Sequence, residues 1–367
     1  MTAKTRVAIL YGGRSAEHDV SRLSAANVLK AIDRTRYEVV PIAISRDGKW
    51  LLQTSIAEDG ASAGGDGAGA PVSEDGIEVA LLPGGKGRLV AVSRDGARPD
   101  LPPVDVVFPV LHGPFGEDGS VQGYAEVADV AYVGCGILAS AAAMDKDVAK
   151  RLLREAGLAV ARSVTVHRNI NSFQEIAGAV GLPFFAKPAR QGSSFGVSKV
   201  NGRDEFEQAV ETAFRYDPKV LIEEFVEGRE IECSVLERAD GTLTVSLPGE
   251  IIPAGKHGFY TYEAKYLDAD GAVVKVPADV PAAVADTARE MARRAFLALG
   301  CEAMARVDFF LRADASLLVN EVNTLPGFTD ISMYAKALAA IGIGYGQVID
   351  ALIEHALARH AKRTVPG

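Results

Sequence analysis

Residues 305–323 of this 367-residue chain read ARVDFFLRADASLLVNEVN, and this stretch decides how the rest of the sequence is interpreted. Residues 305–311 and 317–323 have the composition of β-strands, and the polar residues between them predict a turn. We therefore expect two antiparallel strands that pair as a hairpin.

Polar side chains gather on one face of this hairpin, because alternate residues of a strand point the same way. They are Arg306 and Asp308, with Phe310, on the first strand, and Glu321 and Asn323 on the second. A loop with an even number of residues, centred between positions 314 and 315, places Asp308 opposite Glu321 and Arg306 opposite Asn323. Two carboxylates that face each other at about 4.5–5.5 Å destabilise a sheet.

A divalent cation would relieve this repulsion. Asp308, Glu321 and Asn323 offer only oxygen donors, with no Cys or His, and such a set favours Mg²⁺ or Mn²⁺. Two alternatives stay open at this point. A loop with an odd number of residues would break the facing pair, and a solvated hairpin would simply turn its polar face to water.

A second candidate site is the loop KPARQGSSFG, residues 187–196, which follows an expected strand at 184–187. Its glycines and serines allow backbone N–H groups to surround a phosphate, and Lys187 supplies charge. The loop lacks the Gly-Lys-Ser/Thr ending of a Walker A motif, so an ordinary turn is an equal alternative. The loop FYTYEAKY, residues 259–266, combines aromatic residues with a lysine and suggests a lid over a ligand, or otherwise a packed surface loop.

The chain length allows two or three domains, and its composition is typical of a globular protein. The net charge of −9 argues against a nucleic-acid partner. Three scattered cysteines favour buried thiols in a reducing compartment, and no apolar run reaches the roughly 18 residues of a membrane span. These features predict a cytoplasmic protein with no membrane partner.

Local patterns predict the first elements. Strands at 7–11 and 39–45, with a helix at 21–32 between them, form a βαβ unit and imply a parallel sheet. Asp145 is a candidate N-cap of a helix that runs to Glu155. The apolar stripe expected on this helix consists of Val148, Leu152 and Ala156.

Several stretches together resemble the D-alanine–D-alanine ligase family of the ATP-grasp superfamily. They are YGGRSAEHDVS, VLHGPFGEDGSVQG, Met144-Asp145-Lys146, KPARQGSSFGVSKV, YEAKY, ARVDFF and NEVNTLPGFTDISMY, in an order that spans nearly the whole chain. The resemblance implies three consecutive α/β domains: an N-terminal parallel-sheet domain at 1–134, and two ATP-grasp subdomains at 135–222 and 223–367 whose sheets clamp ATP.

The resemblance also implies roles for individual residues. The expected nucleotide contacts are Lys146, Lys187, Ser194, Glu223, Glu224, Phe225, Val226, Glu230 and Lys265. The expected metal ligands are Asp308, Glu321 and Asn323, which would hold two Mg²⁺ ions, or Mn²⁺. Gln191 and Asn320 depart from the residues common in the family and leave the details of nucleotide contact in doubt.

Further implied roles concern the amino acids. Glu17 would bind the ammonium group of the first D-alanine and form a hydrogen-bonded triad with Ser193 and Tyr266. Arg306 and the Gly327 N–H would stabilise an oxyanion. His112, Ser332 and Met333 would border the substrates, although His112 taken alone favours a structural role.

The activity implied is ATP-dependent ligation of two D-alanines through an acylphosphate, for peptidoglycan precursors, by an enzyme that is usually a homodimer. Tyr266 favours D-alanine over D-lactate as the second substrate. Alternatives are another ATP-grasp carboxylate–amine ligase, a D-alanine–D-lactate or D-serine ligase, a nucleotide-dependent oxidoreductase suggested by Gly12-Gly13, and a non-catalytic nucleotide sensor.

Overall fold

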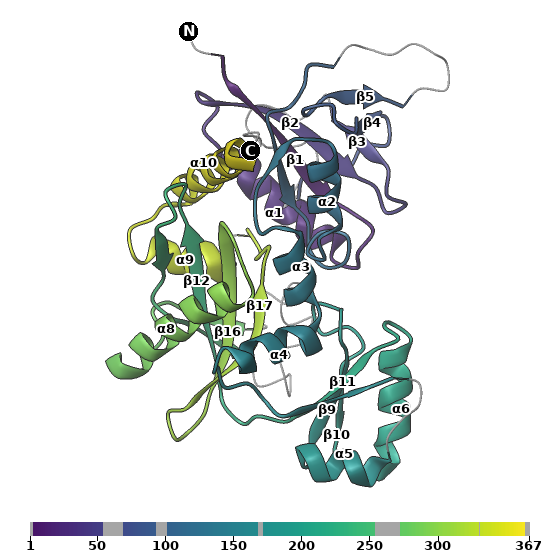
Figure 1. Ribbon diagram of the computed structural model, residues 1–367, viewed down its shortest axis with the longest axis vertical. Helices are drawn as coiled ribbons and strands as arrows, with labels where there is room; N and C mark the ends of the chain where they lie inside the picture. Colours follow the sequence, from purple (N-terminus) through teal and green to yellow (C-terminus); the bar gives the residue numbers. More distant parts are fainter. Residues whose placement is uncertain are drawn as a thin grey trace.

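The computed structural model describes residues 3–53, 69–92, 101–167, 172–253, 272–329 and 331–363. It contains three sheets, with strand orders β5-β4-β3-β2-β1-β6-β7, β10-β9-β11-β8 and β15-β14-β12-β16-β17, and β13 pairs with β12. The three sheets and their helices lie in three parts of the molecule (Figure 1). This arrangement is the mixed α/β fold that the sequence predicts.

The N-terminal sheet is built around parallel strands, as expected from the βαβ pattern. β1 (Thr5–Gly12) pairs in parallel with β2 (Tyr37–Ile44) and β6 (Val106–Val110), and β6 pairs in parallel with β7 (Ala131–Tyr132). One edge continues with antiparallel strands β3 (Trp50–Leu52), β4 (Ile77–Leu81) and β5 (Leu89–Ala91). The accompanying helices are α1 (His18–Ala31) and α2 (Ser120–Val127), so α1 begins three residues earlier than expected.

The four-stranded sheet is antiparallel in every pairing. Its strands are β8 (Ser163–Val166), β9 (Phe184–Pro188), β10 (Ser198–Val200) and β11 (Val220–Glu224). Helices α5 (Phe173–Val180) and α6 (Arg203–Phe214) share one apolar core with these strands. The opposite face of this sheet is left for the site described below.

The six-stranded sheet is antiparallel too. It consists of β12 (Arg229–Glu237), β13 (Leu243–Val245), β14 (Gly249–Pro253), β15 (Ala272–Lys275), β16 (Met304–Leu311) and β17 (Leu317–Asn323). Helices α3 (Ile137–Met144), α4 (Lys146–Glu155) and α8 (Ala282–Ala298) share its core. Packing thus joins α3 and α4 to this sheet, and the division of the chain at 134 and 222 stays a proposal.

The hairpin of β16 and β17 has the predicted facing pairs but reaches them by another route. Arg306 is opposite Asn323 and Asp308 is opposite Glu321, as expected. Nearer the turn the register is centred on Asp314, so the prediction of an even-numbered loop is wrong. A β-bulge after Asp308 places one extra residue, Asn320, in β17 and restores the alignment of the carboxylates.

Helix α4 begins as predicted, since the Asp145 carboxylate accepts a hydrogen bond of 3.2 Å from the Val148 N–H. Its buried face differs from the predicted stripe. Leu152, expected inside, is 38% exposed. The buried side chains are Ala149, Lys150 and Leu153. A lysine inside a helix face is a pattern that apolar periodicity does not predict.

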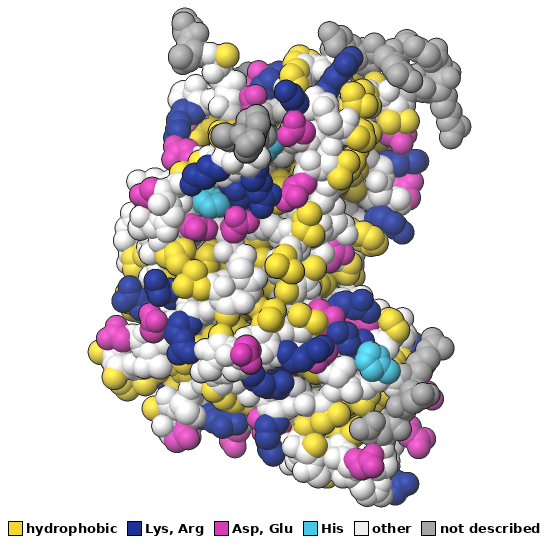
Figure 2. Space-filling model, viewed as in Figure 1, with side chains coloured by type: hydrophobic (Ala, Val, Ile, Leu, Met, Phe, Trp, Pro, Cys, Tyr) yellow, Lys and Arg dark blue, Asp and Glu magenta, His cyan; other side chains and the backbone are white. Residues whose placement is uncertain are grey.

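The C-terminal helix connects the first and last parts of the chain. α9 (Met333–Ala339) and α10 (Tyr345–Arg363) share one apolar core with the N-terminal sheet. Arg359 of α10 donates hydrogen bonds of 2.6 and 2.7 Å to the carbonyls of Tyr132 and Gly134, and it pairs with Glu302 at 3.1 Å. On the face of the molecule shown in Figure 2, acidic and basic side chains are interspersed over the surface.

We expect Arg359→Ala to lower the free energy of unfolding by about 2–4 kcal/mol, because it leaves two buried carbonyls and a carboxylate without their donor. Denaturant unfolding measures the change. Arg363→Ala is the matched control, since this side chain is 46% exposed and pairs with Glu126, and it should cost less than about 1 kcal/mol. Equal losses in the two variants would contradict this role of Arg359.

Candidate active site

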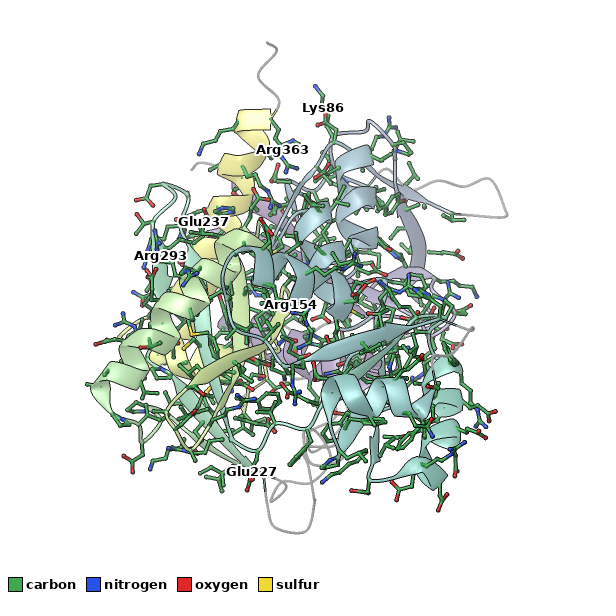
Figure 3. The ribbon with its side chains drawn as sticks, turned by 60° about the horizontal axis from the view of Figure 1, so that its bottom comes forward. Lys86, Arg154, Glu227, Glu237, Arg293 and Arg363 are labelled. Carbon is green, nitrogen blue, oxygen red and sulfur yellow. The ribbon has the colours of Figure 1, made fainter. Side chains whose placement is uncertain are left out.

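Two adjoining cavities lie where the three sheets meet. The larger, about 440 Å³, is enclosed by the four-stranded and six-stranded sheets, and Glu227, which Figure 3 labels between them, lies on its exposed rim. The smaller, about 70 Å³, is bordered by the N-terminal part, by the loop at residues 187–196, which we call the serine loop, and by the hairpin. Both cavities are lined by Lys146, Gln191, Gly192, Ser193 and Glu321. A ligand group in one cavity can therefore meet a ligand group in the other at these residues.

Two lysines predicted to bind phosphate line the larger cavity. Lys146, the first residue of α4, donates a hydrogen bond of 2.6 Å to the Gln191 carbonyl, and burial lowers its pKa. Lys187 on β9 pairs with Glu223 on β11 at 2.5 Å. Burial acts to raise the pKa of Glu223, but Lys187 and Lys150 overcome this effect and lower it to about 2. The Glu223 carboxylate is thus charged and held by lysines.

The serine loop is held to other elements at two of its residues. Arg190 donates hydrogen bonds of 2.6–3.0 Å to Asp217 from its guanidinium and its backbone N–H. Ser193 and Ser194 adopt positive φ values of 50° and 61°, a region that side chains disfavour. Such backbone strain is typical of functional sites. Ser193 donates a short hydrogen bond to Glu17, so the loop also contacts the N-terminal part.

Glu17 occupies a slot between two glycines. A Cβ atom at Gly113 would lie 2.5 Å from its Oε2, and one at Gly192 would lie 2.9 Å from the same oxygen. Gly113 also has φ +71°, a conformation that glycine adopts without strain. The predicted pair of Glu17 and Ser193 is therefore brought together, and larger residues at either glycine would displace the carboxylate.

Glu117 is a second carboxylate in the smaller cavity, and sequence reasoning missed it. It accepts a hydrogen bond of 3.0 Å from the Gly113 N–H. Burial and the nearby charge of Glu17 raise its pKa well above the usual range. Glu117 lies in the stretch VLHGPFGEDGSVQG that carries part of the family resemblance, but only the fold shows that Glu117, and not the adjacent Asp118, lines the cavity.

His112 lies behind the smaller cavity and is 6% exposed. Its ring hydrogen-bonds to Ser24 Oγ at 3.1 Å and to the backbone of Leu325. Burial lowers its pKa to about 4, so the ring is neutral near pH 7. His112 therefore joins α1 to the segment that follows β17, and it also lines the smaller cavity.

The polar face of the hairpin closes the smaller cavity from the other side. Arg306 donates two hydrogen bonds of 2.7 Å to Asp308 and pairs with Glu232 at 3.0 Å. Asn323 donates a further bond of 3.0 Å to Asp308. Arg306 therefore orients the carboxylate that was predicted to bind metal.

The donor set of this face fits a magnesium ion held jointly with phosphate. Asp308 and Glu321 are opposed carboxylates, and Asn323 adds an amide oxygen. Among the described residues no three Asp, Glu, His or Cys side chains form a complete cage. Magnesium is commonly held by one or two carboxylates together with substrate phosphates. The arrangement agrees with that mode.

The segment after β17 contributes backbone to the smaller cavity through Gly327. A Cβ atom at Gly327 would lie 2.8 Å from Ser332 Oγ, so glycine leaves room for this hydroxyl. Ser332 in turn accepts a bond of 3.0 Å from the Thr329 N–H. The Met333 side chain is buried beside Ile251, and neither Ser332 nor Met333 is among the residues that line the two cavities.

Further expected nucleotide contacts line the larger cavity. They are Ser194, Glu224, Phe225, Val226 and Glu230, and Asn320 also lines it. Glu224 accepts hydrogen bonds of 2.7 and 2.8 Å from Arg162. The Phe225 ring lies 6.0 Å from that of Phe185 and gives the cavity an aromatic wall. Lys265 and Tyr266 lie outside the described residues, as does the predicted lid.

Comparisons with known proteins agree with this geometry. The sequence matches the family model described as D-ala D-ala ligase N-terminus over residues 6–135, and the one described as D-ala D-ala ligase C-terminus over residues 152–354. D-alanine–D-alanine ligase A of Mesorhizobium japonicum is 84% identical over 364 residues, which cover 99% of this chain and 100% of that protein. The chain belongs to the D-alanine–D-alanine ligase family. It is an ATP-dependent ligase.

Solved structures of this and a related kind share the fold. The D-alanine–D-alanine ligase of Coxiella burnetii has a TM-score of 0.84 at 33% identity, over 98% of this chain and 96% of that one. VanG, a D-Ala:D-Ser ligase of Enterococcus faecalis, has a TM-score of 0.83 at 34% identity, over 96% of this chain and all of that one. Similarity of fold therefore does not separate ligases that differ in their second substrate.

In the described part of this D-alanine–D-alanine ligase family member, no helix is both long and apolar enough to cross a membrane.

Lys150, like Glu117, was missed by sequence reasoning although it is buried beside the site. Its spacing of four residues from Lys146 on one helix is the signal that would have placed both lysines on neighbouring positions of one face.

His112 should give this ligase a distinct pH dependence of stability. Its pKa of about 4 lies below the usual 6.5, so the neutral ring contributes stability above pH 6.5 that is lost as the pH falls toward 4. Between pH 7.5 and 5, His112→Gln should remove about 2 kcal/mol of this loss in the free energy of unfolding. The exposed His167, changed to Gln, is the control, and an unaltered slope in His112→Gln would contradict the assignment.

Proposed function

We propose that this chain uses ATP to join two D-alanines into D-alanyl-D-alanine through an acylphosphate, for peptidoglycan precursor synthesis. The observation that carries the proposal is the pair of adjoining cavities with Lys146, Ser193 and Glu321 in both walls. A nucleotide in the larger cavity would have its phosphates at this junction. An amino acid in the smaller cavity would then meet the terminal phosphate.

The first step needs a charged nucleotide held beside a carboxylate. An oxygen of the first D-alanine carboxylate attacks the γ-phosphorus, and ADP leaves. Lys146 and Lys187 hold the phosphates, with Ser194 of the strained loop and with Lys265. The segment Glu223 to Val226 and Glu230 bind the adenosine. Asp308, Glu321 and Asn323 would hold two Mg²⁺ ions, or Mn²⁺, which would offset the charge of the phosphates when bound.

Glu17 binds the ammonium group of the first D-alanine, and its hydrogen bond to Ser193 couples that site to the serine loop, which holds the phosphates. Tyr266 would complete this triad. The neutral His112 borders the same amino acid without adding charge, because its pKa is about 4. A neutral ring suits a position beside an ammonium group, since a charged imidazolium would repel it.

In the second step the amine of the second D-alanine attacks the acylphosphate carbonyl, loses a proton, and phosphate leaves. Arg306 and the Gly327 N–H stabilise the oxyanion of the tetrahedral intermediate. The hydrogen bonds from Arg306 to Asp308 fix the guanidinium close to that position. Ser332 and the backbone of Met333 border the second carboxylate.

A D-alanine–D-serine or D-alanine–D-lactate activity is the second candidate, because a D-Ala:D-Ser ligase shares this fold at a TM-score of 0.83. Another ATP-grasp carboxylate–amine ligase follows it. We further propose a cytoplasmic homodimer whose substrate partner is D-alanine and which has no nucleic-acid or membrane partner.

Incubation of the protein with ATP, Mg²⁺ and D-alanine should release phosphate and form D-alanyl-D-alanine in equal amounts. Coupled phosphate detection and chromatography of the dipeptide measure the two products. L-alanine should be inert, because an L-alanine held by the same ammonium and carboxylate groups would direct its methyl group toward a different wall of the cavity. D-serine and D-lactate are offered as second substrates, and a faster reaction with either would favour the second candidate. Phosphate release without dipeptide would refute the proposal.

Asp308→Asn and Glu321→Gln should each lower kcat by about 10²-fold or more, because each removes a carboxylate proposed to hold a divalent ion. Glu321→Gln should change stability little, since it relieves repulsion across the hairpin. Asp308→Asn also weakens the hydrogen bonds from Arg306, so its kcat is measured on protein shown to be folded. Asp314→Asn is the control, because this exposed carboxylate lies in the turn of the same hairpin and accepts hydrogen bonds only from Ser316. Rates near wild type in the first two variants would remove the metal assignment.

A further inference from the structure

Three buried charged side chains form two linked ion pairs beside the larger cavity. Lys150 pairs with one oxygen of Glu223 at 2.5 Å, and Lys187 pairs with the other oxygen at 2.5 Å. Their side chains are 2%, 4% and 13% exposed for Lys150, Glu223 and Lys187 respectively. Of these three residues, Lys187 and Glu223 line the cavity and Lys150 does not.

The three residues come from two different packing units. Lys150 belongs to α4, whose neighbouring residues Ala149 and Leu153 are buried in the core of the six-stranded sheet. Glu223 and Lys187 belong to the four-stranded sheet. In Figure 1, α4 lies between these two sheets, and Figure 3 labels Arg154 one turn beyond Lys150. The ion pair of Lys150 thus joins the two walls of the cavity.

A buried lysine outside the cavity is costly, because burial disfavours its charge. Burial indeed lowers the pKa of Lys150, and the charge of Glu223 opposes that effect. A well-packed apolar residue at this position would avoid the cost. A charged lysine nevertheless occupies this position, so we expect its charge to affect the cavity. It can do so through Glu223, which pairs with Lys150 and lines the cavity.

That consequence follows from the sum of the charges. With Lys150 present, the three groups carry a net charge of +1, and the cavity side of this chain is Lys187. With Lys150 removed, Glu223 would neutralise Lys187 completely, and a carboxylate would lie beside the phosphates with no excess of positive charge. Charge near a buried phosphate acts strongly, since water screens it poorly.

We propose that Lys150 is a positioning residue that neutralises Glu223 and so leaves the charge of Lys187 available to the phosphates of ATP. The inference rests on the proposed function, because it assumes that ATP occupies the larger cavity. Lys150 touches neither nucleotide nor amino acid. It acts through Glu223.

The test is Lys150→Met, which keeps the length of the side chain and removes its charge. The dissociation constant for ATP, measured by calorimetry with Mg²⁺, should rise about ten- to a hundredfold, the range for one charge-assisted hydrogen bond. The KM for D-alanine should stay within about twofold, whereas a purely structural defect would move both constants. Arg151→Met is the matched control, because Arg151 is the next residue of α4, is 64% exposed and pairs with Asp147.

The double variant Lys150→Met with Glu223→Gln separates charge from packing, and it holds even if Lys150→Met alone fails to fold. It replaces the buried pair with neutral residues and is compared with Glu223→Gln alone, because Glu223 itself is proposed to bind the adenosine. If Lys150 acts only through the charge of Glu223, the dissociation constant for ATP of the double variant should lie within about threefold of that of Glu223→Gln. The inference is overturned if folded Lys150→Met binds ATP as wild type does. It is equally overturned if the double variant binds ATP tenfold or more weakly than Glu223→Gln alone.

Failure of this inference and failure of the proposed function give different results. If wild-type protein binds ATP and forms the dipeptide while the variants show no charge effect, only the role of Lys150 is refuted. If wild-type protein binds no ATP, the proposed function is refuted before the variants are compared.

Discussion

The opposition of Asp308 and Glu321 across two antiparallel strands is the constraint on which the rest of the site depends. Like charges at this spacing repel, and the fold does not separate them. It instead surrounds Asp308 with donors from Arg306 and Asn323 and leaves the hairpin face open to both cavities. A site that concentrates negative charge in this way is stable only with cations nearby, and phosphate chemistry needs the same cations.

Those cations come from separate parts of the chain, which explains why three packing units are needed. Lys146 and Lys150 lie one turn apart on α4, Lys187 is the penultimate residue of β9 in the four-stranded sheet, and Arg306 lies on the six-stranded sheet. Each has a carboxylate or carbonyl partner that fixes its direction. Positions fixed before the ligand arrives do not have to be reorganised during reaction, and this is the main source of electrostatic catalysis.

The N-terminal part is held to this frame from two sides. On one side Glu17 meets Ser193 in the glycine-walled slot. On the other, α10 shares a core with the first sheet, and Arg359 bonds to carbonyls at the end of β7. The smaller cavity therefore has walls from segments more than 300 residues apart in sequence, at Glu17 and Gly327, and the hydrogen bond from Asn27 to the Phe328 carbonyl joins the same two parts of the chain.

The sequence by itself determined the features that depend on neighbours along the chain: the βαβ opening, the Asp145 cap, the hairpin and the motifs that carry the family resemblance. Tertiary structure alone decided the rest. The Asn320 bulge aligned Asp308 with Glu321, although the loop has the register that was expected to separate them. Lys150 is buried because Glu223, 73 residues away, stabilises its charge, and local periodicity contains no information about that partner. Glu117 faces the cavity because the fold brings its segment beside Glu17.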